Sequence, residues 1–60
     1  MRYSELIREL RKLKCKIIRE GGSHAIWYSP ITGRTFPVSR HAAEEVPAGT
    51  LKAIKRDAGL

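Results

Sequence analysis

The residues of this chain best suited to chemistry are His24 and the three residues before it, Gly21-Gly22-Ser23. A histidine side chain can exchange a proton near neutral pH. The two glycines free the backbone to turn tightly or to let a ligand approach closely. The run that follows, Ala25-Ile26-Trp27-Tyr28, has the composition of a strand. The sequence therefore predicts a proton-exchanging group at the junction of a turn and a strand.

The charge of the chain is strongly positive and unevenly distributed. Twelve lysines and arginines against six acidic residues give the 60 residues a net charge of +6. Residues 1–20 hold seven of the basic residues and only three of the acidic ones. One-sided positive charge is typical of a protein that binds a polyanion, although net charge of this size also serves solubility alone. A histidine on such a domain indicates chemistry on a phosphodiester, with RNA as the substrate.

Cleavage of RNA by internal attack needs a base for the 2′-hydroxyl, an acid for the leaving 5′-oxygen, and positive charge near the phosphorus. His24 is the candidate general acid or base, and His41 is a candidate for the second role. Gly22 and Ser23 position His24 and can also contact phosphate. The other candidate RNA-binding residues are the basic ones that follow each other early in the chain: Arg8, Arg11, Lys12, Lys14, Lys16 and Arg19. The alternative for His24 is a histidine that only packs or hydrogen bonds at the start of a strand.

Other catalytic chemistries lack their sequence signatures here. The chain has six candidate metal ligands, namely His24, His41, Cys15, Glu44, Glu45 and Asp57. Their spacing matches neither a zinc site nor a cluster of carboxylates for a divalent cation. The glycines at 21 and 22 are not followed by the Lys-Ser/Thr pair of a phosphate-binding loop. We therefore expect no metal and no small-molecule cofactor.

The single cysteine and the absence of long apolar runs indicate where the protein works. Cys15 has no partner for an internal disulfide, which fits a reducing compartment, and we expect it to be buried and inert. No signal peptide is evident, and no apolar run approaches the roughly 20 residues of a membrane span. We expect a soluble cytoplasmic protein with no membrane partner.

Hydrophobic spacing predicts a helix near each end of the chain. The first helix carries one apolar stripe, formed by Tyr3, Leu6, Ile7, Leu10 and Leu13. Ser4 is its predicted N-cap. The second helix begins near Pro47 and ends at Gly59, with Leu51, Ile54 and Ala58 as its apolar stripe.

Three strands are predicted between the helices, at residues 15–19, 24–28 and 35–39. Pro37 cannot donate to a strand ladder, so the last strand lies at an edge. Residues 1–60 then form a single α+β domain in the order α-β-β-β-α, with two helices on one face of a three-stranded antiparallel sheet. Alternation puts His24, Ile26 and Tyr28 on one face and Ala25 and Trp27 on the other, and we expect Trp27 in the core. The sheet face without helices is open to solvent or to a partner.

Four segments in order carry a family resemblance. They are Ser4-Glu5-Leu6-Ile7 through Leu13, then Gly22-Ser23-His24, then Arg40-His41, and finally Gly49-Thr50-Leu51 with Ile54 and Ala58-Gly59-Leu60. Together they resemble the HicA toxins of bacterial and archaeal toxin–antitoxin pairs. Three positions depart from the family pattern: Lys14-Cys15 stands where a glycine and an aromatic residue are common, and Ser39 stands where proline is frequent.

The resemblance implies a fold like that of double-stranded-RNA-binding domains. It implies an mRNA interferase, a ribonuclease that cleaves mRNA independently of translation and arrests growth, with His24 as its catalytic residue. It also implies a HicB-type antitoxin that binds the toxin and masks this histidine. Two alternatives remain open: a non-catalytic RNA-binding module of the same fold, for single- or double-stranded RNA, and an interaction protein whose basic face binds an acidic partner.

Overall fold

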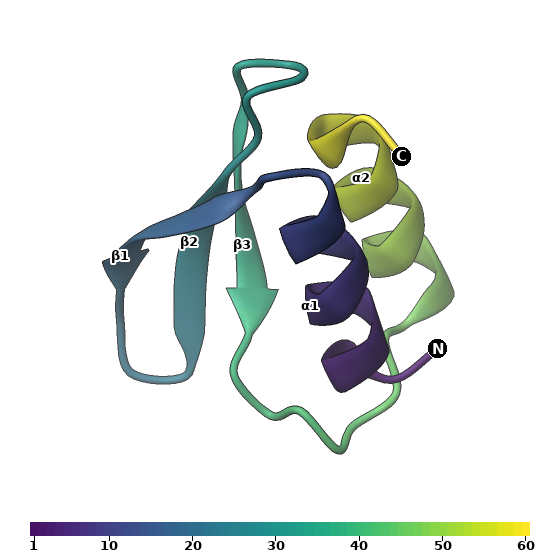
Figure 1. Ribbon diagram of the computed structural model, residues 1–60. Coiled ribbons are helices and arrows are strands. Elements are labelled where there is room, and N and C mark those ends of the chain that lie inside the picture. The colour runs from purple at the N-terminus through teal and green to yellow at the C-terminus, as the bar shows by residue number, and fades with distance from the viewer.

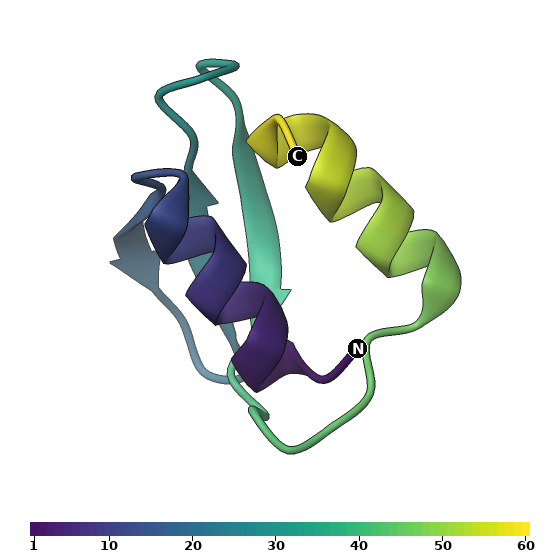
Figure 2. The same cartoon turned by 45° about the vertical axis from the view of Figure 1, so that its right-hand side comes forward.

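Helices and strands follow one another in the predicted order. The computed structural model describes residues 1–60 and contains α1 (Tyr3–Lys12), β1 (Lys16–Glu20), β2 (His24–Tyr28), β3 (Thr35–Ser39) and α2 (Ala48–Ala58). The strands form an antiparallel sheet in the order β1-β2-β3. Both helices lie on the same side of this sheet (Figures 1 and 2). The predicted double-stranded-RNA-binding-like fold is therefore confirmed.

The hydrophobic core lies between the helices and the covered face of the sheet. Trp27 is 2% exposed and Ala25 3% exposed, which confirms the face predicted from alternation. Because β2 is the central strand, its inward side chains lie between those of both neighbours. The buried apolar cluster consists of Tyr3, Leu6, Leu10, Cys15, Ala25, Trp27, Phe36, Val38, Val46, Ile54 and Ala58. Pro37 lies in β3, an edge strand as predicted.

The start of α1 differs from the prediction. Arg2, not Ser4, is the N-cap residue. The Glu5 carboxylate reaches back and accepts a hydrogen bond from the Arg2 backbone N–H at 2.9 Å, which is half of a capping box. The Tyr3 and Ser4 N–H groups donate to the carbonyls of Glu44 and Ala42, each at 3.0 Å. A distant loop thus satisfies the first free N–H donors of a helix that begins before Ser4.

The turn from α1 into β1 uses a left-handed residue. Lys14 has a φ of 66°, and its N–H donates to Arg11 while that of Cys15 donates to Leu10. This pattern is a Schellman motif, in which glycine is the preferred left-handed residue. Lysine therefore takes here a conformation that glycine adopts without strain. The turn also delays β1, which begins at Lys16 rather than at residue 15.

The loop between β2 and β3 is fastened to the end of α2. Buried Ser29 donates its hydroxyl hydrogen to the Ala58 carbonyl at 2.7 Å, and Thr32 donates in the same way to the Asp57 carbonyl. Gly59 ends α2 with a φ of 89°, as predicted for a helix-terminating glycine. These contacts satisfy carbonyls that a helix end leaves free. Neither helix is long and apolar enough to cross a membrane.

Replacing Lys14 by glycine is expected to stabilise the fold. Relief of left-handed strain, about 1–2 kcal/mol, exceeds the extra backbone entropy that glycine loses, roughly 0.5–1 kcal/mol. Lys14→Gly should therefore raise the free energy of unfolding by about 0.5–1 kcal/mol in urea denaturation followed by circular dichroism. Arg8→Gly, which removes the same charge from the middle of α1, is the control and should lower that free energy by about 1 kcal/mol. A lower midpoint for Lys14→Gly would contradict the argument.

Candidate active site on the open sheet face

His24 stands on the sheet face that the helices leave uncovered. It is the first residue of β2, and its side chain is exposed. Since Ala25 and Trp27 point into the core, His24 points to the opposite side. Its Nδ1 lies 3.2 Å from the hydroxyl oxygen of Ser23, so the serine can hold one ring nitrogen. The other nitrogen, Nε2, forms no hydrogen bond within the chain.

The turn that carries His24 is anchored from both neighbouring strands. The Gly21 N–H donates to the His24 carbonyl at 2.8 Å, and the Arg40 N–H donates to the Ser23 carbonyl at 3.0 Å. The guanidinium of Arg40 also donates to the Gly21 carbonyl at 3.0 Å and lies 3.8 Å from the Glu20 carboxylate. Arg40 is thus a positioning residue that the predicted site did not include. Its place in the Arg40-His41 segment was the only signal for it in the sequence.

The backbone conformation at position 22 does not require glycine. Positive φ values occur at Gly33 and Gly59 but not at Gly21 or Gly22. A Cβ added at Gly22 would meet no atom within 4 Å, whereas one at Gly21 would lie 3.3 Å from the His24 carbonyl oxygen. The tight turn predicted from the two glycines therefore does not depend on Gly22. The open space beside it fits the other predicted use, a close approach by a ligand.

A β-bulge in β1 decides which basic residues share the face of His24. Lys16 pairs with Tyr28 and Arg19 pairs with Ile26, with a register shift between Ile17 and Arg19. In a regular strand, residues three apart point to opposite faces. The extra residue in the bulge restores Arg19 to the face of Lys16. Both cations therefore lie on the uncovered face with His24, and neither forms an ion pair within the chain.

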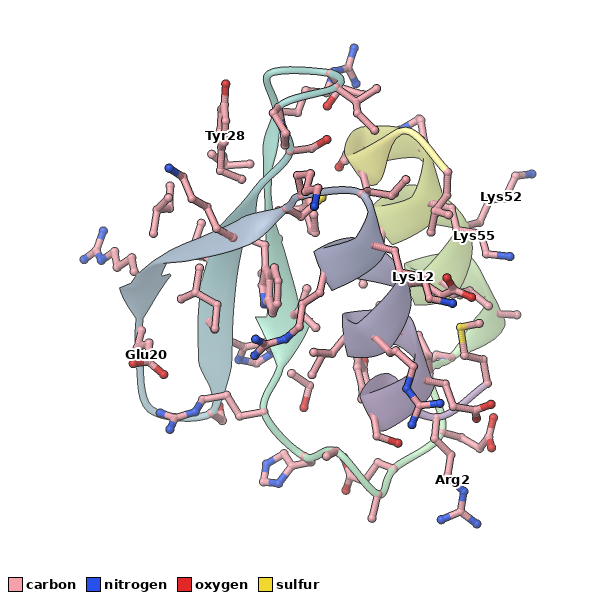
Figure 3. All side chains as sticks on the ribbon, viewed as in Figure 1. Arg2, Lys12, Glu20, Tyr28, Lys52 and Lys55 are labelled. Carbon is pink, nitrogen blue, oxygen red and sulfur yellow. The ribbon has the colours of Figure 1, made fainter.

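The remaining predicted basic residues do not lie on this face. Arg8, Arg11 and Lys12 belong to α1, on the other side of the sheet, and Figure 3 shows Lys12 on that helical side. The Arg11 guanidinium carbon lies 5.8 Å from the centre of the Trp27 ring, which indicates a cation–π contact. Lys14 lies in the turn between α1 and β1. The structure thus divides the predicted RNA-binding set between two surfaces.

His41 follows the strand that faces His24. Ser39 is the cross-strand partner of His24, and the His41 backbone N–H donates to the Ser39 hydroxyl at 3.2 Å. The chain therefore brings the segment of the second histidine to the same end of the sheet as the first. No three histidine, cysteine or acidic side chains come together in a way that would hold a metal ion.

The fold and this site define a small domain of the double-stranded-RNA-binding-like class with an exposed histidine. The family model described as the HicA toxin of bacterial toxin–antitoxin systems matches residues 3–60. The chain therefore belongs to the HicA toxin family, and it has the role of a toxin with an antitoxin partner and an RNA target. No curated relative and no solved structure matched the chain.

The open space beside Gly22 can be tested by filling it. Gly22→Ala should change the free energy of unfolding by less than about 0.5 kcal/mol. Gly59→Ala is the control and should cost roughly 1–2 kcal/mol, because its φ is 89° and its Cβ would lie 2.8 Å from Ile31. If the space receives a ligand backbone, Gly22→Ala also weakens RNA binding in a fluorescence anisotropy titration. Unchanged RNA affinity would reject that use of the space.

Proposed function

We propose that this chain is an endoribonuclease of the mRNA interferase type, acting without a metal or cofactor. His24 is the general acid or base that cleaves the phosphodiester. The observation that carries the proposal is an exposed imidazole, held at a braced turn, on a sheet face with two unpaired cations. The family resemblance assigns the catalytic role to the same histidine, which supports this reading of the geometry.

The proposed reaction uses the free ring nitrogen of His24. As a base, Nε2 takes the proton of the 2′-hydroxyl while the 2′-oxygen forms a bond to phosphorus and the bond to the 5′-oxygen breaks. As an acid, the protonated ring gives its proton to that 5′-oxygen. Arg19, which pairs with Ile26 and is the nearer of the two cations, offsets the charge that develops on the phosphoryl oxygens, and Lys16, beside Tyr28, binds the RNA backbone farther along the strand. Ser23 positions the ring through Nδ1, and His41 is the candidate for the complementary proton transfer.

The geometry also supports a docking surface for a HicB-type antitoxin. β1 is an edge strand with free backbone hydrogen-bonding groups, and its Ile17 and Ile18 are 40% and 53% exposed. A groove of about 170 Å³ lies between α1 and the strands of the sheet, lined in part by Ile7, Arg11, Ile17 and Trp27. We propose that the antitoxin binds this edge and groove and from there covers the face of His24. Toxin, antitoxin and mRNA then meet in the cytoplasm.

A second candidate function is a non-catalytic RNA-binding module of the same fold. It is favoured by one observation: the structure anchors only one imidazole on the open face, whereas efficient cleavage uses both an acid and a base. Such a module would bind RNA with strong salt dependence and leave it intact.

Replacing His24 separates these two functions. His24→Ala should slow RNA cleavage at least 100-fold while the fold and RNA binding persist, because the side chain is exposed. The measurement is cleavage of RNA in excess EDTA by the original chain and the variant, with folding checked by circular dichroism. His41→Ala in the same assay shows whether the second histidine takes part. Equal cleavage by His24→Ala and the original chain would refute the proposed mechanism, and no cleavage by either would favour the binding module.

The antitoxin surface is tested by reversing charge next to the groove. Arg8→Glu with Arg11→Glu should slow association with the antitoxin, because charges near an interface mainly change the association rate. Lys52→Glu with Lys55→Glu makes the same change on α2, where Figure 3 shows both lysines on the helical layer, and is the control. Association rates come from surface plasmon resonance at two salt concentrations. Equal slowing by both pairs would indicate a general charge effect instead of a surface near α1.

A further inference from the structure

The uncovered sheet face carries one aromatic side chain that the core does not use. Tyr28 is the last residue of β2 and points away from the helices, as Figure 3 shows. Its ring is half-buried, and its hydroxyl forms no hydrogen bond within the chain. Its cross-strand neighbours on this face are Lys16 in β1 and Thr35 in β3. A partly exposed aromatic ring between a cation and a small polar side chain offers a surface on which a base can stack.

The rest of the face connects this ring to the histidine. Tyr28, Ile26 and His24 follow each other along one side of β2, so about 13 Å separate the two ends at roughly 3.3 Å per residue. Arg19 lies beside Ile26 at the middle of this row, and Lys16 lies beside Tyr28. Cations thus border the path on the β1 side. Ile26 and its partner Pro37 supply an apolar floor between the ends.

This arrangement fits unpaired nucleotides better than a duplex. Bases in a double helix are stacked on each other and do not present a face to a protein ring, whereas single-stranded RNA can place a base on an aromatic side chain. The basic residues of α1 lie on the other side of the sheet and cannot contact the same short stretch of strand. A substrate cleaved at His24 therefore meets Tyr28, Lys16 and Arg19.

We propose that the open sheet face is a binding surface for single-stranded RNA, on which Tyr28 stacks on a base a few nucleotides away from the cleaved phosphate. Lys16 and Arg19 neutralise the backbone between these points. That the bound RNA is also the cleaved substrate rests on the proposed ribonuclease function. The stacking contact itself is a binding property that can be measured without cleavage. Tyr28 thereby sets the substrate class, an RNA segment without base pairs.

Binding is measured first, on the His24→Ala chain so that RNA stays intact. The probes are a fluorescent single-stranded RNA of ten nucleotides and a hairpin of the same composition, titrated by anisotropy. Tyr28→Ala should weaken single-strand binding about 5- to 100-fold, and Tyr28→Phe should retain it because the ring remains. Tyr28→Leu keeps an apolar side chain without a π face and should behave like Tyr28→Ala. Hairpin binding should be weaker than single-strand binding and should change little in all three variants.

Cleavage by the chain with His24 intact is measured second. Tyr28→Ala should raise KM for the single-stranded RNA and leave kcat within about threefold, because the ring binds substrate at a distance from the reacting atoms. Folding of every variant is checked by circular dichroism. Single-strand affinity unchanged in folded Tyr28→Ala and Tyr28→Leu, or tighter binding of the hairpin, would overturn the proposed stacking surface. Either result leaves the His24 cleavage test standing, so failure of the stacking surface is distinguishable from failure of the nuclease.

Discussion

Burial on one side of a three-stranded sheet is the constraint on which the rest of this structure depends. Two helices of 10 and 11 residues cover one face of the sheet and no more. Trp27 and its inward neighbours fill the space beneath them, and a buried aromatic side chain contributes a large share of the stability of so small a core. The other face consequently stays uncovered, and every outward residue of the central strand becomes available for function. His24 is exposed for the same reason that Trp27 is buried: they stand on opposite sides of one strand.

The β1–β2 hairpin converts this uncovered face into a site. The bulge at Ile18 and the turn at residues 21–23 are both local irregularities, yet together they decide which side chains meet. Without the extra residue, Arg19 would point to the helical side, and the cation nearest to the middle of the β2 row would be lost from the face. The contacts of Arg40 with the Gly21 and Ser23 carbonyls then fix the turn relative to β3. The bulge puts Arg19 on the same face as Lys16 and His24, and Arg40 fixes the turn that carries the histidine.

Sequence periodicity was sufficient for the elements and insufficient for the site. The helical stripe, the strand alternation and Pro37 at an edge are properties of single segments, so they could be predicted segment by segment. The bulge is a property of a pair of strands, and no residue type at positions 17–19 indicates it in the sequence. The regular alternation of side chains along a strand predicts Lys16 and Arg19 on opposite faces. The N-cap was missed for a related reason, since the donors near Ser4 are satisfied by carbonyls some 40 residues later in the chain. The left-handed conformation of Lys14 could not be predicted either, because a lysine in the sequence does not indicate a positive φ.

The division of positive charge between two surfaces bears on how one small toxin can serve both an RNA and an antitoxin. β1 lies at the border between these surfaces: Lys16 and Arg19 point to the face of His24, whereas Ile17 lies on the helical side beside Arg11. A partner that adds a strand along β1 would satisfy its free edge and would approach both surfaces at once. Such a partner need not contact the imidazole to block it, because a chain packed against β1 and leaning over the sheet excludes an RNA strand from the row between Tyr28 and His24. Of the two edges of the sheet, only that of β1 contains no proline, so a partner paired with β1 would control the proposed activity from the border between the two surfaces.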